Sequence, residues 1–260
     1  MGNNIVMIKT AIILAGGLGT RLKSAVGDLP KCMAPVKGIP FINFIITYLK
    51  NEGIEYFIFS LGYKSEVVIN YVDNKYPDLQ KKYVVEDKQL GTGGAIKEAC
   101  KWVTEKNTIV VNGDTLFNIN LDKLSLFHNT TDADCTIALK KMENFDRYGV
   151  VETDYNYRIN AFREKQFCIQ GCINGGVYAL SVAGLNKDVY PEVFSFEKEY
   201  LEKNTGVKNL YGIVNSGYFI DIGIPEDYQR FQNDYQLIVD NNNLHAATQN
   251  IPQFLKELNK

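Results

Sequence analysis

The chain has 260 residues, of which 45% are hydrophobic and 22% charged, and its formal net charge at pH 7 is −2. This composition supports a sizeable folded core and excludes wholesale disorder. No block of lysine and arginine stands out, so the electrostatic footprint of a nucleic-acid-binding protein is absent.

Apolar runs alternate with helical patterns over the first half of the chain. Strands are predicted at Ala11–Leu14, Tyr56–Ser60, Tyr83–Glu86 and Thr108–Val111. Helices with apolar residues at i, i+3 and i+4 are predicted between them, at Pro40–Asn51, Ser65–Lys75 and Gly93–Thr104. Strand–helix–strand repetition with short connections predicts right-handed crossovers and a mainly parallel sheet. We therefore expect an α/β fold with a doubly wound, Rossmann-like sheet flanked by helices, which binds ligands outside the carboxyl ends of its strands.

The second half has shorter, more alternating segments that are typical of antiparallel or mixed strands. Strands are predicted at Cys135–Lys140, Gly149–Thr153, Arg158–Arg163, Gly171–Ala179 and Ser216–Ile220. Helices are predicted at Ser181–Val189, Phe196–Lys203 and Pro225–Val239. We expect a single domain over residues 1–240, with halves at 8–115 and 116–240, followed by a tail at 241–260. A short amphipathic stretch in this tail, Ile251–Leu258, is more typical of packing on its own chain or a sister subunit than on a membrane.

Targeting signals are not evident. The apolar run near the N-terminus leads into a glycine-rich turn rather than a cleavage site, and no stretch approaches the ~20 apolar residues of a membrane-spanning helix. Gly2 lacks the serine or threonine that N-myristoylation requires, because Val6 stands there. The five cysteines are odd in number and scattered, and neither histidine lies near the Cys168/Cys172 pair, which favours reduced thiols over a metal site. We expect a cytoplasmic protein with no membrane partner.

A glycine-rich turn follows the first predicted strand. The run LAGGLGTR at residues 14–21 is followed by Pro30-Lys31. Backbone N–H groups of such a turn can close on an anion, and arginine and lysine suit phosphate oxygens. The run is neither a Walker A loop nor the GxGxxG fingerprint, which disfavours a dehydrogenase on a dinucleotide-binding fold. A plain strand-to-helix turn is the alternative, and the added Thr20-Arg21 and Pro30-Lys31 argue against it.

Two aspartates end apolar strands. Asp114 lies in VVNGDTLF and Asp221 in YFIDIGIP. A carboxylate at the end of a strand is well placed to hold Mg²⁺. Each aspartate alone is equally well explained as a turn former or a helix N-cap. The occurrence of both, together with an anion-binding turn, favours a metal.

The segment LAGGLGTRLKSAVGDLPKCMAPVKGIPFI resembles the opening of the sugar-1-phosphate nucleotidyltransferases, whose pattern is GGxGTRLxPLT…PKPMxPV. The resemblance extends from Lys9 to Tyr228, with the motifs in the family's order. It implies the nucleotide-diphospho-sugar transferase fold, with residues 8–115 as the nucleotide-binding half and 116–240 as a sugar-binding half with a small mixed or antiparallel part. The chain departs from the pattern at residues 23–26, where most members carry a proline-containing stretch, and at Cys32, where many have proline.

The resemblance also implies a reaction that joins a nucleoside triphosphate to a sugar 1-phosphate and releases pyrophosphate. Two unit charges 4 Å apart repel by ~4 kcal/mol at an effective dielectric of 20, so the protein must neutralise the phosphates. Such transfer depends on positioning and charge stabilisation. The catalytic residues implied are Arg21 for the leaving pyrophosphate, Lys31 between the α-phosphate and the attacking phosphate, and Asp114. Asp114 and Asp221 match the family's GD and DIG(T)P motifs, whose carboxylates bind Mg²⁺, although Ile224 replaces the usual threonine.

Substrate contacts follow from the same motifs. The nucleotide-binding residues implied are Leu14, Ala15, Gly16, Gly17, Gly19, Thr20, Arg21, Glu86, Gly91, Thr92 and Gly113. Glu86 suits the N1–H and N2–H₂ donors of guanine, whereas an exposed strand-end glutamate explains it equally well. Glu164 and Lys165 match the F-x-E-K motif of the sugar-phosphate site, and Asn174 matches N-(A/G)-G-(I/V)-Y. Tyr148, Gly149 and Glu197 are further candidates there, for which a hairpin turn and a solvated helix face are the stronger alternatives.

Three functions remain to be separated. The chain is most similar to the branch that uses GTP and D-glycero-α-D-manno-heptose 1-phosphate for bacterial capsule or S-layer glycans. The same chemistry with mannose 1-phosphate and GTP, or glucose 1-phosphate and dTTP or UTP, is the first alternative. A non-catalytic module that senses nucleotide sugars is the second, and Arg21, Lys31, Asp114 and Asp221 argue against it. A homo-oligomer is compatible with the sequence.

Overall fold

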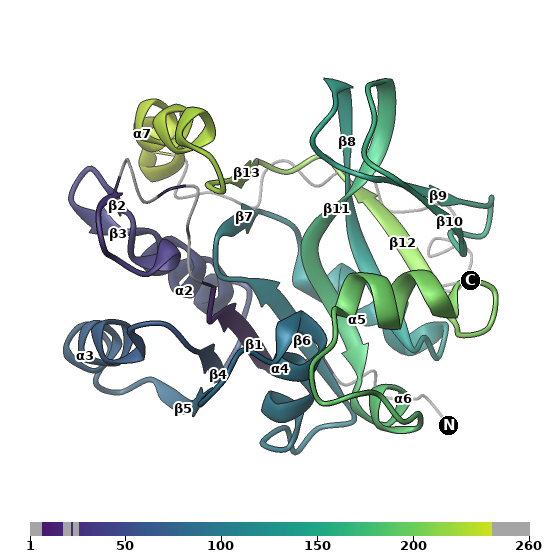
Figure 1. Ribbon diagram of the computed structural model, residues 1–260, viewed down its shortest axis with the longest axis horizontal. Coiled ribbons are helices and arrows are strands. Elements are labelled where there is room, and N and C mark those ends of the chain that lie inside the picture. The colour runs from purple at the N-terminus through teal and green to yellow at the C-terminus, as the bar shows by residue number, and fades with distance from the viewer. Residues whose placement is uncertain (1–6, 18–21, 23–25, 241–260) are drawn as a thin grey trace.

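The centre of the molecule is a nine-stranded sheet, in the order β10-β9-β11-β6-β1-β4-β5, with β8 paired to β11 and β12 paired to β8. The computed structural model describes residues 7–17, 22 and 26–240. The first half supplies four parallel strands, β1 (Thr10–Ala15), β4 (Tyr56–Leu61), β5 (Gln80–Val85) and β6 (Asn107–Asn112). Three helices connect them, α2 (Phe41–Asn51), α3 (Ser65–Lys75) and α4 (Gly91–Cys100) (Figure 1). The predicted α/β class with a mainly parallel central sheet is confirmed.

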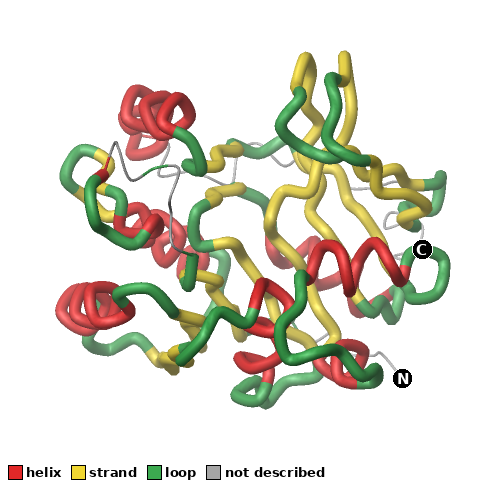
Figure 2. The backbone as a smooth tube through the Cα atoms, viewed as in Figure 1, coloured by secondary structure: helices red, strands yellow, loops and turns green. Residues whose placement is uncertain are grey.

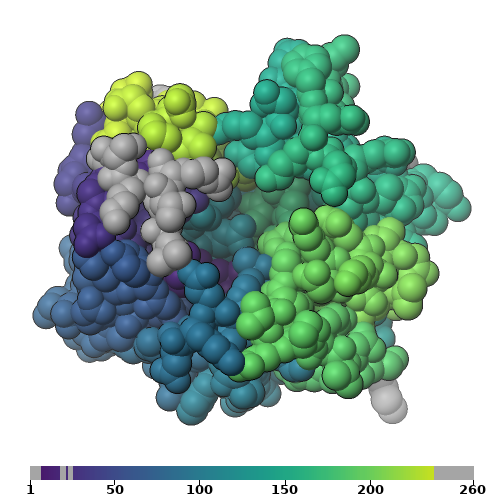
Figure 3. Space-filling view, in the orientation of Figure 1, coloured from purple at the N-terminus to yellow at the C-terminus, as the bar shows by residue number. Residues whose placement is uncertain are grey.

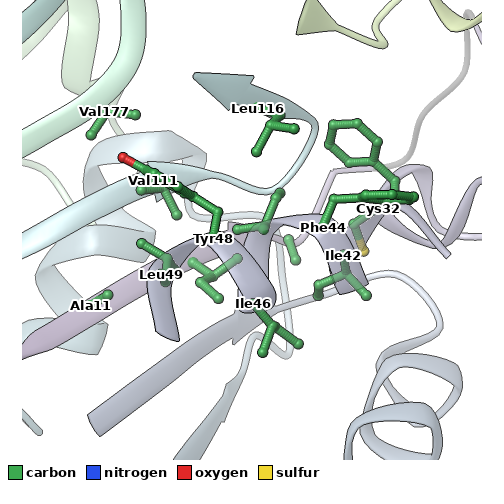
Figure 4. Close-up of a cluster of buried hydrophobic side chains, with 14 of the residues drawn as sticks. Ala11, Cys32, Ile42, Phe44, Ile46, Tyr48, Leu49, Val111, Leu116 and Val177 are labelled. Carbon is green, nitrogen blue, oxygen red and sulfur yellow. The ribbon is translucent and has the colours of Figure 1, made fainter. Parts of the chain in front are cut away.

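Strands β1, β4 and β6 are buried along almost their whole length, which agrees with their apolar runs, whereas the edge strand β5 is largely exposed or half-buried. Along β1, Ala11 and Ile13 pack in one hydrophobic cluster with residues of α2 and α3, whereas Ile12 packs in a second cluster with Ile96 of α4. Helices therefore cover the two faces, and Figure 2 shows the strands running between them. Figure 4 shows the first cluster, in which Ile46 and Leu49 of α2 lie beside the strands.

The second half continues the same sheet with antiparallel pairs. Its strands are β8 (Cys135–Phe145), β9 (Val150–Thr153), β10 (Ile159–Arg163), β11 (Cys168–Ser181) and β12 (Leu210–Asn215). Strand β11 runs antiparallel to β6, β8 and β9, while β12 is parallel to β8. The parallel core and the mixed part thus share one hydrogen-bonded sheet.

Two small sheets complete the fold. Strand β7 (Thr115–Phe117) pairs with β13 (Phe219–Asp221), and β2 (Pro35–Val36) pairs with β3 (Ile39–Pro40). The first of these pairs joins two segments about a hundred residues apart in the sequence. It brings the ends of the two halves together beside the central sheet (Figure 1).

Several element predictions need correction. The helix expected at Gly93–Thr104 begins at Gly91 and ends at Cys100, and that expected at Ser181–Val189 is only Val182–Asn186 (α6). The segment expected to be helical at Phe196–Lys203 is a six-residue π-helix, η2 (Phe196–Leu201), followed by a 3₁₀ turn, η3 (Glu202–Asn204). The strand expected at Ser216–Ile220 is replaced by β12 and β13.

One helix and one short turn were not predicted, and the helix predicted at Pro225–Val239 is confirmed. Helix α5 (Leu121–Thr130) was missed, although Asn120 caps it by accepting a hydrogen bond from the Lys123 N–H at 2.7 Å. Helix α7 extends over Pro225–Asp240, and η1 is a 3₁₀ turn at Lys31–Met33. The predictions for the tail at 241–260 fall outside the described part of the chain.

All five cysteines are free thiols, and Cys32, Cys100 and Cys135 are buried. No helix among the described residues is both long and apolar enough to cross a bilayer.

Candidate active site

Two adjoining pockets open at the carboxyl ends of the parallel strands, where a doubly wound sheet binds its ligands. The first pocket has a volume of about 370 Å³ and is lined by the ends of β1, β4 and β6 and the start of α4. The second has a volume of about 660 Å³ and is lined mainly by residues of the second half. Asn112 lines both. Figure 3 shows this face hollowed near its centre, between the purple-to-blue residues and the green ones.

The first pocket gathers the residues predicted to bind nucleotide. Those that line it are Leu14, Ala15, Gly16, Gly17, Glu86, Gly91, Thr92 and Gly113, together with the predicted catalytic residues Lys31 and Asp114. Gly19, Thr20 and Arg21 lie outside the described residues. Cys32, Ser60, Gln89, Ala95 and Asn112 also line it and were not selected as individual site residues. Ser60 and Asn112 lie at the ends of β4 and β6, so the strand-end rule that selected Asp114 could have found them.

Gly113 fixes the position of Asp114. Its N–H donates to the Leu14 carbonyl at 2.8 Å, and a Cβ at Gly113 would lie only 2.6 Å from that oxygen. A side chain would force β6 away from β1 at this point. The glycine therefore permits the close backbone approach that brings Asp114 to the floor of the pocket.

Glu86 is half-buried at the rim of the first pocket rather than an exposed strand-end residue. Its Oε2 accepts a hydrogen bond from the Leu90 N–H at 3.2 Å. Burial raises the pKa of the Glu86 carboxyl, and hydrogen bonds from Leu90 and Ser60 lower it in part. A carboxylate offers about four acceptor positions, so it can still accept from a ligand.

Asp114 and Asp221 lie close together because β7 and β13 are paired. Asp114 directly precedes β7, Asp221 ends β13 opposite Thr115, and the Ile222 N–H donates to the Asp114 carbonyl at 3.0 Å. The Lys31 ammonium contacts Asp114 Oδ2 and lies 3.7 Å from Asp221 Oδ1. The structure thus brings together the three charged residues that were predicted separately from different motifs.

Both carboxylate oxygens of Asp221 have partners. Oδ1 accepts from the Gly223 N–H at 2.7 Å, and Oδ2 accepts from the Tyr148 hydroxyl at 3.4 Å. Burial, and next the neighbouring charge of Asp114, raise the pKa of Asp221, while the Lys31 ammonium opposes the rise. Tyr148, which was predicted to contact the sugar phosphate, therefore orients a carboxylate in this structure. Burial of the Tyr148 side chain, and next the charge of Asp221, raise the pKa of its hydroxyl.

The chemistry of this pair fits a hard divalent cation. Among the described residues, no group of three or more histidine, cysteine, aspartate or glutamate side chains could hold a metal. Mg²⁺, however, is usually bound by one or two carboxylates together with water and substrate phosphates. Two aspartates where two pockets adjoin are a donor set of that kind.

The second pocket gathers the residues predicted to bind the sugar phosphate. Those that line it are Tyr148, Gly149, Glu164, Lys165, Asn174 and Glu197, together with Asp221. The Asn174 side chain is held at both ends, because Oδ1 accepts from the Gly176 N–H at 3.0 Å and Nδ2 donates to the Tyr178 hydroxyl at 2.9 Å. Polar lining residues that sequence reasoning did not select are Thr115, Arg147, Arg163, Ser195, Lys198 and Glu202.

Glu197 links the two pockets instead of lying on a solvated helix face. Its Oε2 accepts from the Thr92 hydroxyl at 2.7 Å and from the Ser195 hydroxyl at 2.9 Å. The Thr92 hydroxyl in turn accepts from the Phe196 N–H at 2.8 Å. The start of α4, which lines the first pocket, is thereby tied to η2, which lines the second.

The chain is similar to known proteins over most of its length. The family model described as nucleotidyl transferase matches residues 10–237. The D-glycero-alpha-D-manno-heptose 1-phosphate guanylyltransferase of Aneurinibacillus thermoaerophilus is 47% identical over 226 residues, which cover 87% of this chain and 98% of that protein. The protein of the same name from Campylobacter jejuni is 46% identical over 221 residues, 85% of this chain and 97% of that one.

A solved structure is also similar over most of the chain. The crystal structure of HddC from Yersinia pseudotuberculosis superimposes with a TM-score of 0.79 at 36% identity, covering 88% of this chain and 100% of that one. A second crystal structure of HddC, complexed with GMP-PN, superimposes with a TM-score of 0.78 at 37% identity and covers the same shares, 88% and 100%.

Proposed function

The chain belongs to the nucleotidyl transferase family, and we propose that it transfers GMP from GTP to D-glycero-α-D-manno-heptose 1-phosphate, giving GDP-heptose and pyrophosphate. The substrate pair comes from the relatives at 47% and 46% identity. The observation that carries the proposal is that Lys31 and both aspartates lie where two pockets adjoin. One pocket has the size and strand-end position for a nucleotide, and the other has polar groups for a sugar phosphate.

In this proposal an oxygen of the sugar phosphate attacks the α-phosphorus of GTP. The new P–O bond forms as the bond from the α-phosphorus to the bridging oxygen breaks, and that oxygen leaves with pyrophosphate. Lys31 would bind the reacting phosphates, and Arg21 the leaving pyrophosphate. Asp114 and Asp221 would hold Mg²⁺, which supplies positive charge against the phosphates when bound. Leu14–Gly17, Gly19 and Thr20 would supply the phosphate-binding turn.

Selection of the two substrates would fall to different pockets. Glu86 would accept hydrogen bonds from guanine, with Gly91, Thr92 and Gly113 close to the nucleoside. Glu164 and Glu197 would accept hydrogen bonds from sugar hydroxyls, and the Asn174 amide would accept or donate one. Lys165 would pair with the sugar phosphate, with Tyr148 and Gly149 beside it. Support comes from their shared position around the two pockets. We further propose residues 8–115 and 116–240 as the two functional halves of one domain, a cytoplasmic location, and use of the product in capsule or S-layer glycans.

The substrate pair is tested by measuring pyrophosphate release for the four nucleoside triphosphates against heptose, mannose and glucose 1-phosphates, with and without Mg²⁺. We expect release with GTP and the heptose 1-phosphate, and only when Mg²⁺ is present. Release with a different pair would keep the reaction class and refute the substrates. Absence of release with every pair, from protein that binds nucleotide, would favour the sensing module.

The Glu86→Gln variant tests recognition of guanine. The amide would present an NH₂ group to the guanine N–H donors and lose a charge-assisted hydrogen bond, so we expect kcat/KM for GTP to fall roughly 10- to 100-fold. The value for UTP should change much less. Asp87→Asn is the matched control, since it removes the neighbouring exposed carboxylate, which lines neither pocket. An unchanged ratio of GTP to UTP use would remove Glu86 from base recognition.

A further inference from the structure

The Lys31 side chain lies between the two carboxylates at the junction of the pockets. It is 13% exposed, contacts Asp114 Oδ2 and lies 3.7 Å from Asp221 Oδ1. Lys31 begins η1, directly after Pro30, and the Ala34 N–H donates to its carbonyl at 3.1 Å. The position of the ammonium is therefore set by a short ordered turn and by two acceptors.

The backbone near Asp221 leaves room for this ammonium. A Cβ at Gly223 would lie 3.0 Å from Lys31 Nζ and 2.8 Å from Asp221 Oδ1. Any side chain at residue 223 would therefore crowd the ammonium and the carboxylate together. Gly223 thus leaves the ends of these two side chains in their present positions.

The second pocket also holds Arg147, whose ion pair lies elsewhere. Arg147, the arginine next to Tyr148, forms its ion pair with Asp227 at the start of α7. Within the described ranges, no lysine or arginine other than Lys31 forms an ion pair with Asp114 or Asp221. Among the described residues, these two negative charges thus have one compensating ammonium in direct contact.

We propose that Lys31 is the resident counter-ion of Asp114 and Asp221, and that a divalent cation has to displace its ammonium before these carboxylates can ligate it. The inference rests on the proposed function, since it takes the two aspartates as metal ligands. An ammonium and a divalent cation would compete here because Lys31 already contacts the Asp114 carboxylate that would hold the metal. The phosphates of a nucleotide offer the displaced ammonium new acceptors, so nucleotide and metal should each strengthen the binding of the other.

The test is a titration of the nucleotide-free protein with Mn²⁺, in which binding is measured from the electron paramagnetic resonance signal of the free ion. Lys31→Met removes the competing charge and should bind Mn²⁺ roughly tenfold more tightly or better than the parent protein. Lys106→Met is the matched control, because Lys106 is an exposed lysine paired at 2.9 Å with Asp132, and its affinity should not change. Equal or weaker binding by Lys31→Met would overturn the proposal.

A second variant and a second measurement guard against a simple folding defect. Lys31→Gln keeps a polar side chain without the charge and should also tighten Mn²⁺ binding. In thermal unfolding with a chelator both variants should be less stable than the parent, because the carboxylates have lost their counter-ion, and Mn²⁺ should raise their Tm by more than it raises that of the parent. A Tm difference that Mn²⁺ leaves unchanged would mean that Lys31 is only structural.

The metal assignment itself is tested separately by combining Lys31→Met with Asp114→Asn. The double variant should lose the tight Mn²⁺ binding. If it kept that affinity, the metal would lie elsewhere and the proposed role of Asp114 would fail. If Lys31→Met bound Mn²⁺ no more tightly than the parent, and the double variant bound it more weakly than both, the metal site would stand and the counter-ion role would fail.

Discussion

Asp114→Asn and Asp221→Asn are each expected to lower kcat for nucleotide-sugar formation by about 10³-fold or more while leaving the fold intact. Each substitution removes one of the two anionic oxygen ligands proposed for Mg²⁺. It also leaves the Lys31 ammonium, which both carboxylates now share, as an excess positive charge beside the remaining acid. Because phosphoryl-type transfer depends on placed charge, neither loss can be recovered by substrate concentration.

The measurement is steady-state pyrophosphate release at saturating substrates, with a Mg²⁺ titration for each variant. Asp132→Asn is the control, because Asp132 is an exposed aspartate whose partner, Lys106, is also on the surface. It should retain the parent rate. Thermal unfolding of all three variants separates loss of chemistry from loss of structure. Near-parent rates for either active-site variant in Mg²⁺ would show that the pair does not hold the metal.

The parallel part of the fold could be predicted because its signals are local. Strands such as Thr10–Ala15 are continuous apolar runs that end in turn residues, and α2 has a strong apolar stripe. The predicted helix Ser65–Lys75 matches α3 at both ends. In these segments the burial that stabilises the element is visible as periodicity in the chain itself.

The elements that were missed are those whose stability comes from distant partners. Strand β12 contains Gly212 at its centre and follows a polar turn, and it forms because it pairs in parallel with β8 about 75 residues earlier. Helix α5 is largely polar in sequence, and its buried face includes Leu124 and His128, which are four residues apart. Local propensity did not identify either segment, since tertiary pairing decides its structure.

The candidate site divides in the same way. Motif and strand-end position were sufficient to select Lys31, Asp114 and Asp221 as members of a site. Their mutual contacts depend on the register of β7 with β13, which no local pattern encodes. The Thr92–Glu197 hydrogen bond joins residues 105 positions apart and likewise required the fold. Sequence reasoning thus selected residues that the fold gathers around the two pockets, and it could not say which of them touch.

His128, one of the chain's two histidines, gives the largest expected effect on stability. It lies on α5 and is 1% exposed, with Nδ1 3.0 Å from the Thr136 hydroxyl. Burial lowers the pKa of its imidazole from 6.5 to about 4, and the charge of Lys106 adds to this, while Asp132 and Asp134 act in the opposite direction. Within the described residues its Nε2 has no hydrogen-bond partner, so nothing there stabilises a second ring proton.

The sign of the pH effect follows from this depressed pKa. Above pH 6.5 the imidazole is neutral in both the folded and the unfolded chain. Between pH 6.5 and 4 the unfolded chain takes up a proton that the folded chain does not, so the free energy of unfolding decreases as the pH is lowered. The pKa difference between 6.5 and about 4 corresponds to a loss of ~3 kcal/mol.

Urea unfolding at steps from pH 7 to pH 4 measures this loss of stability. His128→Gln cannot take up the proton and should lose that share of the slope, whereas His245→Gln, which removes the other histidine, should keep it. Parallel curves for the parent and His128→Gln over this range would mean that His128 is not held neutral by burial.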